Sequence, residues 1–320
     1  MRSVQRSSCL LLLLSAAAIG ACTSPPGGAA GSGPASNPSP ARPPATVGIF
    51  EAPSNAGPEH PVRLAVSADG IVFASDPRVN KVLGYRGGNK VVELDGLDGP
   101  LGLAVQGDRL LVGNTGRHDV EVYDWRAGRY LGVLGGGLGE VTMPNSIAVA
   151  PDGRVYVVDS REDMVKVYGS GGTRVATLGG TGSGDGQFRF PVAVAADGSD
   201  IVVADQGNHR VQMFDGKARW LRSLGSLPAS DTATLAEMRG HFTTIGGVAL
   251  KNGDVYVLDS ALGHVQVIDA AGTSKGFFGR IGDCRSCTRL AADLAFQPDG
   301  TLLVSDPLAR RWVTPEKVTP

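Results

Sequence analysis

The segment PVAVAADGSDIVVADQGNHRVQMF, residues 191–214, carries the pattern that decides the fold. An apolar stretch runs into an Asp-Gly turn, a second apolar stretch ends in Asp, and a short loop leads to a third stretch that opens on a charged residue. Copies of this pattern are PVRLAVSADGIVFASDPRVNKV (61–82), PLGLAVQGDRLLVGNTGRHDVEVY (100–123), PNSIAVAPDGRVYVVDSREDMVKV (144–167), IGGVALKNGDVYVLDSALGHVQVI (245–268) and AADLAFQPDGTLLVSDPLARRWV (291–313). A unit of short strands that recurs every roughly 40 to 50 residues predicts an all-β fold, a six-bladed β-propeller.

Each blade is expected to hold four antiparallel strands, lettered a to d from the axis outward. In the fourth blade the predicted strands are Val192–Ala195, Ile201–Ala204, Val211–Phe214 and Leu221–Leu224. Asp-Gly dipeptides between them predict hairpin turns, because Gly adopts positive φ without strain.

The sixth blade has no segment after Val313 that reads as an outer strand. The segment TVGIF (46–50) reads like the outer strands of other blades. We therefore expect it to pair with strand c of the sixth blade and close the ring, which would cover an exposed edge. The propeller would then span residues 46–320.

Residues 1–21 have the features of an export signal. Arg2 and Arg6 precede an apolar core that is too short for a permanent membrane span. The core ends in Ile19-Gly20-Ala21-Cys22, which resembles a bacterial lipobox. This resemblance implies cleavage before Cys22 and attachment of lipid to Cys22; the alternative is an ordinary secretory signal with a chance cysteine.

Residues 22–45 are rich in Pro, Gly, Ser and Ala, and they cannot bury enough apolar surface to offset the entropy of ordering. We expect a disordered tether between the lipid and the propeller. The propeller would then lie outside the cytoplasm, anchored in the bacterial cell envelope. Thr23 follows the cysteine where an inner-membrane retention signal often has Asp, which favours the outer membrane, facing the periplasm, in a cell with two membranes.

Two cysteines remain in the mature domain, Cys284 and Cys287. A C-x-x-C pair outside the cytoplasm is typical of a local disulfide. A redox-active pair and a metal site are the alternatives, although no second C-x-x-C or H-x3-H pair would complete a zinc site.

The formal net charge is −1, and it is −3 without Arg2 and Arg6. Nucleic-acid-binding domains usually carry a strong basic excess, so this class of function is excluded. We expect a monomeric propeller.

The segment ADQGNHRVQMF (204–214), preceded by GSGDGQFRFPVAVAADG (182–198), resembles the NHL repeat family. The resemblance implies a six-bladed propeller in which any active site lies at the axial mouth, where the a strands begin. Related lyases hold a metal there with histidines, and lactonase-type propellers use Glu, Asn and Asp.

The equivalent positions in this chain hold mostly Val, Leu, Gly and Ala, with no histidine. Only Asn145 and Asp293 resemble lactonase ligands, which is fewer oxygen ligands than a divalent ion needs. We therefore expect no catalytic residue, no metal site and no cofactor. A lyase or lactonase that uses the axial mouth is the alternative.

Basic side chains recur in the loops between strands b and c, and His241 lies in a connection that leads into strand a. A ring of such side chains could produce a positive potential that attracts an anionic ligand or an acidic partner. The alternative is a solvated rim whose charge Asp119, Glu162 and Asp163 offset, with the loop histidines serving turn structure. The candidate binding residues are Arg63, Arg78, Arg117, Arg161, His209, Arg210, His241, His264 and Arg310.

A longer connection covers residues 226–245. Its segment ATLAEMR (233–239) consists mostly of helix-favouring residues, and Ser230-Asp231 could cap it, so we expect a short helix there.

Together these patterns predict a membrane-anchored propeller that acts as a binding or scaffold module for an envelope protein or anionic ligand. A propeller enzyme and a purely architectural envelope protein are the alternatives, because a fold alone does not assign function.

Overall fold

The computed structural model describes residues 45–54, 58–137, 139–198, 200–230 and 233–318. The predicted signal segment, Cys22 and the tether up to residue 44 lie outside the described residues. Within the described ranges, no helix has the length and apolar character needed to cross a membrane.

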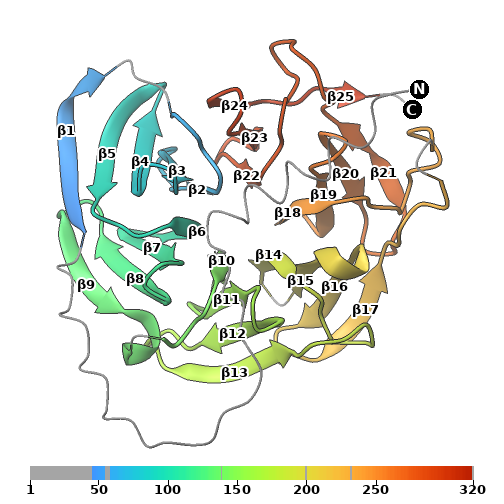
Figure 1. Cartoon of the computed structure of the whole chain (residues 1–320), viewed down its shortest axis with the longest axis horizontal. Helices are drawn as coiled ribbons and strands as arrows, with labels where there is room; N and C mark the ends of the chain where they lie inside the picture. The colour runs from blue at the N-terminus through green and yellow to red at the C-terminus, as the bar shows by residue number, and fades with distance from the viewer. Residues whose placement is uncertain (1–44, 55–57, 138, 199, 231–232, 319–320) are drawn as a thin grey trace, which may run out of the picture. The chain divides into compact units, whose positions relative to one another are not determined.

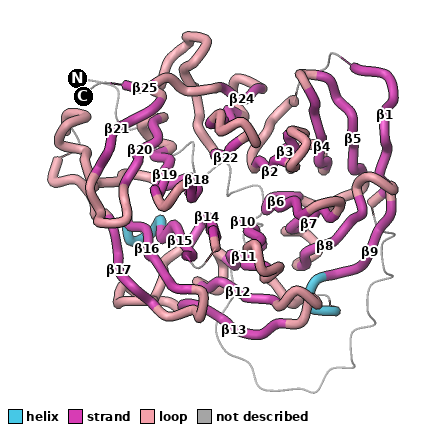
Figure 2. The backbone as a smooth tube through the Cα atoms, turned by 180° about the vertical axis from the view of Figure 1, so that it is seen from behind, coloured by secondary structure: helices cyan, strands magenta, loops and turns pink. Residues whose placement is uncertain are grey.

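The unit Ala45–Pro320 is a six-bladed β-propeller, as the repeats predict. Its innermost strands surround the centre in Figure 1, one from each blade. Helix among the described residues is limited to two short 3-10 turns, η1 (Leu134–Gly136) and η2 (Gln206–Asn208), which are cyan in Figure 2.

Each blade is an antiparallel meander that starts at the axis. Blades one to three contain β2 (Leu64–Val66), β3 (Val72–Asp76), β4 (Lys81–Arg86) and β5 (Asn89–Asp95); β6 (Pro100–Gln106), β7 (Arg109–Asn114), β8 (Asp119–Asp124) and β9 (Arg129–Val133); and β10 (Pro144–Val149), β11 (Val155–Asp159), β12 (Met164–Tyr168) and β13 (Arg174–Gly179). Blades four to six contain β14 (Pro191–Asp197), β15 (Asp200–Asp205), β16 (Arg210–Asp215) and β17 (Trp220–Leu224); β18 (Ile245–Lys251), β19 (Asp254–Asp259), β20 (His264–Ile268) and β21 (Ser274–Phe278); and β22 (Leu294–Phe296), β23 (Leu302–Asp306) and β24 (Arg311–Val313). The four strands predicted for blade four are confirmed to within two residues at each end.

The core lies between neighbouring blades. Phe73 of blade one contacts Trp125 of blade two with ring centroids 5.3 Å apart, and Tyr85 of blade one contacts Trp312 of blade six at 5.4 Å. Because each sheet is covered on both faces, the inner strands are nearly continuous apolar runs rather than alternating ones.

The predicted ring closure by residues 46–50 is wrong. β1 (Thr46–Ser54) pairs antiparallel with β5 as a fifth strand of blade one, with Thr46 opposite Asp95 and Ile49 opposite Val92. Ala45 is buried in the core between blades one and two, and this contact holds the segment at the edge of blade one.

The sixth blade lacks an outer strand, as expected, and keeps three strands. The C-terminal strand β25 (Lys317–Val318) leaves blade six and pairs with β21 of blade five. Blades six and one are joined by contacts between their sheets, such as Tyr85 with Trp312, and by hydrogen bonds near the axis. There the Leu64 N–H donates to Asp293 over 2.9 Å and the Ser305 hydroxyl donates to the Val62 carbonyl over 2.8 Å.

The helix expected at 233–239 is also wrong, because residues 235–240 form turns. One helical hydrogen bond occurs, from Met238 N to the Thr234 carbonyl over 3.0 Å. Buried Gln266 of β20 then bonds the backbone of this segment, donating to the Met238 carbonyl and accepting from the Gly240 N–H. These contacts with a neighbouring strand take the groups that would have continued the helix.

Candidate functional site

The loops named in the sequence lie on one face of the propeller. Strand register places the start of each a strand opposite the end of the b strand, as in Pro144 with Asp159 and Pro191 with Asp205. The b–c loops are therefore next to the connections that lead into strand a, here called entry loops. We call this the entry face, and the opposite face, with the a–b and c–d turns, the turn face.

The polar residue that closes each b strand holds the entry loop of its own blade. It is buried in all six blades and accepts a hydrogen bond from a backbone N–H about 16 residues earlier in the chain. The pairs are His60 with Asp76, Asp98 with Asn114, Thr142 with Asp159, Arg189 with Asp205, Thr243 with Asp259 and Arg289 with Asp306. This set explains why the repeat ends its second strand on Asp or Asn.

The last residue of each b–c loop has a left-handed backbone. The six residues are Asn80, His118, Asp163, His209, Gly263 and Arg310, with φ between 53° and 63°. Four of their side chains bond the entry loop of the next blade, at Gly99, Thr142, Phe190 and Thr243. His209 and His118 therefore connect neighbouring blades, which supports the turn interpretation of these histidines.

Two arginines of the predicted rim serve the scaffold. Arg117 pairs with buried Glu121 and donates to the Gly96 carbonyl over 2.6 Å. Arg210 lies 2.8 Å from Asp205 and donates to the carbonyls of Gly184 and Gln187.

Two histidines of the predicted rim are also engaged. His264 is buried against Phe277, with ring centroids 5.0 Å apart, and burial holds its pKa below the usual histidine value. His241 lies in the long connection, where its Nδ1 is 2.9 Å from the Ser226 hydroxyl.

Arg78, Arg161 and Arg310 are exposed on the entry face, and none pairs with an acidic side chain among the described residues. Three further arginines, absent from the residues predicted above, are exposed in entry loops and equally unpaired within the described ranges: Arg189, Arg280 and Arg285. The signal that could have identified them is their place in the entry loops, on the same face as the b–c loops.

The turn face has a different charge arrangement. Its arginines and lysines mostly pair with acidic side chains, many of them on the same hairpin. Such pairs are Arg86 and Arg126 with Asp69, Arg154 with Asp152, Arg219 with Asp215 and Lys275 with Asp254.

Arg63 does not lie on a binding rim. Its buried side chain crosses the axis, and all five of its N–H donors have acceptors in other blades. Nε donates to the Asn145 carbonyl, Nη1 to the Gly246 carbonyl and Asp293, and Nη2 to the Asn145 side chain and the Val192 carbonyl, over 2.6 to 3.3 Å. A guanidinium whose donors are all used cannot bind an anion.

Room for the guanidinium comes from the other blades. The positions equivalent to Arg63 hold small residues in four blades and a carboxylate in the sixth: Gly102, Ser146, Ala193, Gly247 and Asp293. Burial raises the pKa of Asp293, and the positive charge of Arg63 opposes this shift. A single Arg and a single Asp in a ring of small residues was the sequence signal for this ion pair, and it was missed.

Arg63 closes the axial channel at its entry-face end. The oxygens of Asn145 and Asp293, the two lactonase-like positions, already accept hydrogen bonds from its guanidinium. A cavity of about 320 Å³ continues along the apolar inner strands, from Arg63 to Val66 in blade one. The described residues contain no group of three His, Cys, Asp or Glu side chains that could hold a metal ion.

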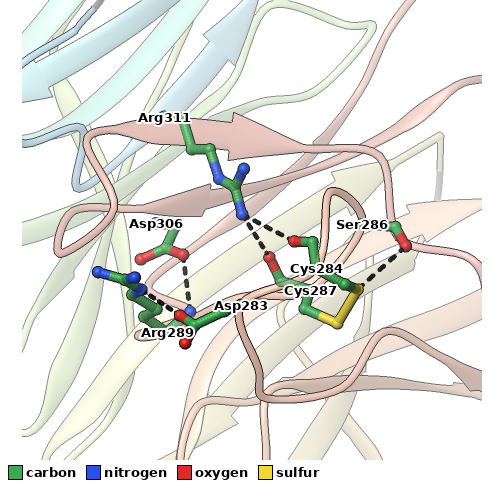
Figure 3. The surroundings of a disulfide bond; sticks show 7 residues. All are labelled: Asp283, Cys284, Ser286, Cys287, Arg289, Asp306 and Arg311. Carbon is green, nitrogen blue, oxygen red and sulfur yellow. Dashed lines mark hydrogen bonds and ion pairs between the residues drawn. A yellow bond between two sulfur atoms is a disulfide. The ribbon is translucent and has the colours of Figure 1, made fainter.

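Cys284 and Cys287 form a disulfide in the entry loop of blade six, as predicted. Figure 3 shows Arg311 of β24 donating to the carbonyls of both cysteines, over 3.0 and 3.1 Å. Arg210 of β16 makes the same pair of bonds to Gly184 and Gln187 in blade four.

The same entry loop in blade four has no cysteines. There the Gln187 side chain accepts from the Gly184 N–H over 3.0 Å, and in both loops a Gly at the same place has φ near 156°. The disulfide therefore takes the place of a side-chain hydrogen bond within one shared loop conformation, which indicates a structural role.

A family model described as "NHL repeat" matches residues 188–214. The chain contains an NHL repeat. The matched residues include the end of the entry loop, the b–c loop and His209. The contacts of Arg189 with Asp205 and of His209 with the next blade are therefore a physical basis of the motif.

One curated human protein, the E3 ubiquitin-protein ligase NHLRC1, is 34% identical over 82 residues, which is 25% of this chain and 21% of that protein. The matched segment thus spans about a fifth of the length of this relative.

Solved propellers share the fold at low identity. A streptogramin B lyase structure has a TM-score of 0.54 at 11% identity, covering 82% of this chain and 95% of the other. A hydrazine synthase chain from Kuenenia stuttgartiensis has a TM-score of 0.56 at 15% identity (85% and 99% covered), and a chain of a nidogen/laminin complex has 0.55 at 19% (68% and 79% covered). At these identities the likeness concerns the fold alone.

Proposed function

We propose that this protein is a lipid-anchored binding module of the bacterial cell envelope, which uses the entry face of its propeller to hold an anionic partner. The observation that carries the proposal is the difference in charge pairing between the exposed cations of the two faces. Exposed turn-face cations are mostly paired with nearby carboxylates. On the entry face Arg289 is paired, whereas Arg78, Arg161 and Arg310 are exposed and lack an acidic partner within the described residues.

Unpaired guanidinium groups favour an acidic partner for two physical reasons. Their summed potential speeds the encounter with negative charge, and a guanidinium can bind a carboxylate through two parallel hydrogen bonds. The scaffold beneath them is rigid, because buried Asp residues and left-handed loop residues fix each loop to its neighbours. A rigid loop loses little entropy when a partner binds.

The anchoring part of the proposal rests on the lipobox-like sequence before Cys22 and the tether after it. Cys22→Ser should move the protein from the membrane fraction to the soluble extracytoplasmic fraction. Retention in the membrane fraction would contradict the proposed anchor.

The binding part is tested with Arg78→Glu, Arg161→Glu and Arg310→Glu combined in one variant, used to capture partners from the protein's own membranes. The matched control combines Arg86→Glu, Arg219→Glu and Lys275→Glu on the turn face, which changes the net charge equally. We expect the entry-face variant to lose partners that wild type and control retain. Equal capture by both variants would overturn the proposal.

A further inference from the structure

Phe190 has a backbone conformation that a bulky side chain rarely adopts. Its φ is 46°, in the left-handed region, and the residue is 38% exposed. The equivalent entry-loop residue of blade two is Gly99, with φ 59°, and the two residues make the same contact. Gly99 N donates to Asn80 and Phe190 N donates to Asp163, each on the preceding b–c loop.

This comparison separates what the shared contact needs from what blade four contains. Where the preceding b–c loop supplies a side-chain acceptor, as Asn80 and Asp163 do, the contact uses a left-handed residue with a free N–H, and glycine supplies both without strain. The equivalent residues of the other four blades, His60, Met143, Thr244 and Leu290, are not left-handed. Phenylalanine at this position costs conformational energy and leaves more than a third of the residue's surface in water. Strained residues that the fold does not need are a recognised mark of functional sites.

The surroundings of Phe190 indicate what it contacts. The hydrogen bond of 2.7 Å between Phe190 N and the Asp163 carboxylate holds the loop that carries Arg161 against the loop that carries Arg189. Both arginines are exposed and have no acidic partner in the part of the chain that the structure describes. On the other side, Gly207 lets the b–c loop of blade four approach the Arg189 loop, because a Cβ there would lie 2.7 Å from the Arg189 carbonyl oxygen.

We propose that Phe190, Arg161 and Arg189 form the central contact of the entry face, and that it binds a peptide segment in which acidic residues flank an apolar one. Aromatic and arginine side chains are the types that dominate binding energy at protein interfaces. The exposed ring favours a peptide over a purely ionic polymer, because a polyanion without apolar groups would gain nothing from it. This inference rests on the proposed function and specifies the site within it.

The probe is a fluorescently labelled dodecapeptide of alternating Glu and Leu, with an all-Glu dodecapeptide as its comparison. Wild type should bind the Glu/Leu peptide at least tenfold more tightly than the all-Glu peptide. Equal affinity for the two peptides would overturn the assignment to an apolar-acidic peptide. Binding to phosphatidylglycerol vesicles as tight as binding to the Glu/Leu peptide would overturn it as well.

Two substitutions distinguish the backbone strain at Phe190 from the contact of its ring with the peptide. Phe190→Gly should weaken peptide binding about tenfold or more and raise the melting temperature by about 2–4 °C, because the strain is relieved. Phe190→Ala should weaken binding equally without this gain, because alanine keeps the left-handed strain. Wild-type binding by Phe190→Gly, or a lower melting temperature, would show that the ring serves packing instead.

The charge contribution is tested with Arg161→Gln and Arg189→Gln combined, against Lys217→Gln, an exposed cation on the turn face of the same blade. We expect weaker binding and a smaller salt dependence only for the double variant. Capture that depends on Arg78 and Arg310 but not on Phe190 or Arg189 would retain the proposed function and overturn this site.

Discussion

The Arg63 guanidinium lies 3.3 Å from the Asp293 carboxylate across the propeller axis, although 230 positions separate the two residues in the sequence. Both side chains are largely buried, with 7% and 12% of their surface exposed. Through this pair and its hydrogen bonds, Arg63 of blade one contacts blades three to six. The entry-face end of the axis is therefore a polar, hydrogen-bonded centre, in which removal of one partner leaves the others unsatisfied.

Arg63→Met should destabilise the protein by about 3 to 5 kcal/mol, because it leaves a buried carboxylate without its counter-charge. Denaturant unfolding checks this value. Loss of Arg63 removes the charge that opposes the upward shift of the Asp293 pKa. The deficit should therefore be smaller at pH 4.5 than at pH 7.5, since a raised carboxyl pKa lowers stability as the pH rises.

Asp293→Asn provides the control in the Arg63→Met background. The amide oxygen can still accept from the Leu64 N–H, but the buried charge is gone. The double variant should recover part of the lost stability and lose the pH dependence. A double variant that is less stable than Arg63→Met would contradict the interpretation.

The entry loop of blade six should tolerate loss of its disulfide if it receives the bonds of blade four. Cys284→Ser with Cys287→Ser should lower the free energy of unfolding by about 2 kcal/mol, the entropic value for a loop this short. Cys284→Gly with Cys287→Gln copies Gly184 and Gln187 and should recover much of this loss.

Reducing agent distinguishes the two variants from wild type. It should lower the melting temperature of wild type and leave both variants unchanged. Thiol–disulfide exchange activity that disappears in both variants would instead support the redox alternative.

Asp119 should make the protein more stable when its charge is removed at neutral pH. Burial raises its pKa to about 6, and the neighbouring Glu121 adds to the shift. The folded state therefore binds the proton more tightly, and the free energy of unfolding falls as the pH rises from about 4 to about 6. Asp119→Asn should add about 2 kcal/mol at pH 7.5 and little at pH 4.

Asp152→Asn serves as a control of opposite sign. Hydrogen bonds from the Arg154 backbone and side chain lower the pKa of Asp152, so its removal should reduce stability at neutral pH and reduce it less as the pH falls below 4. An Asp119→Asn variant without pH-dependent gain would show that its carboxyl is ionised at no cost.

Deletion of residues 45–54 should destabilise the outer edge of blade one and leave the contact between blades one and six unchanged. The backbone of β5 loses the partner that β1 supplies, so amide exchange should accelerate in residues 89–95. Exchange in β24 should not change, because β24 pairs only with β23 among the described strands. Faster exchange in β24 would revive the original closure hypothesis.

The sequence could predict the parts of this fold that depend on neighbours in the chain. The Asp-Gly turns, the apolar runs of β14 and β15, and the missing outer strand of blade six follow from local pattern, because a hairpin is formed by residues close in sequence. The C-x-x-C disulfide has the same origin, since its two cysteines are three residues apart.

Other features were decided only by tertiary structure. The segment TVGIF has the character of an outer strand, but its sequence does not say which blade it joins. Burial of Ala45 between blades one and two places it at the outer edge of blade one. Residues 233–239 consist mostly of helix-favouring types, yet they form turns. Gln266 of β20, 28 residues later in the sequence, donates to the Met238 carbonyl and so takes a group that a longer helix would need.

For the candidate site, too, some features follow from the sequence and others from contacts between blades. The sequence by itself determined that this chain is a six-bladed propeller with basic side chains in its loops, because each repeat specifies its own hairpins. Tertiary structure decided which of those charges are available: Arg63, Arg117 and Arg210 bond the scaffold, whereas Arg78, Arg161 and Arg310 remain exposed. The physical reason is that a charge's partners are set by contacts between blades, and residues tens to hundreds of positions apart make those contacts.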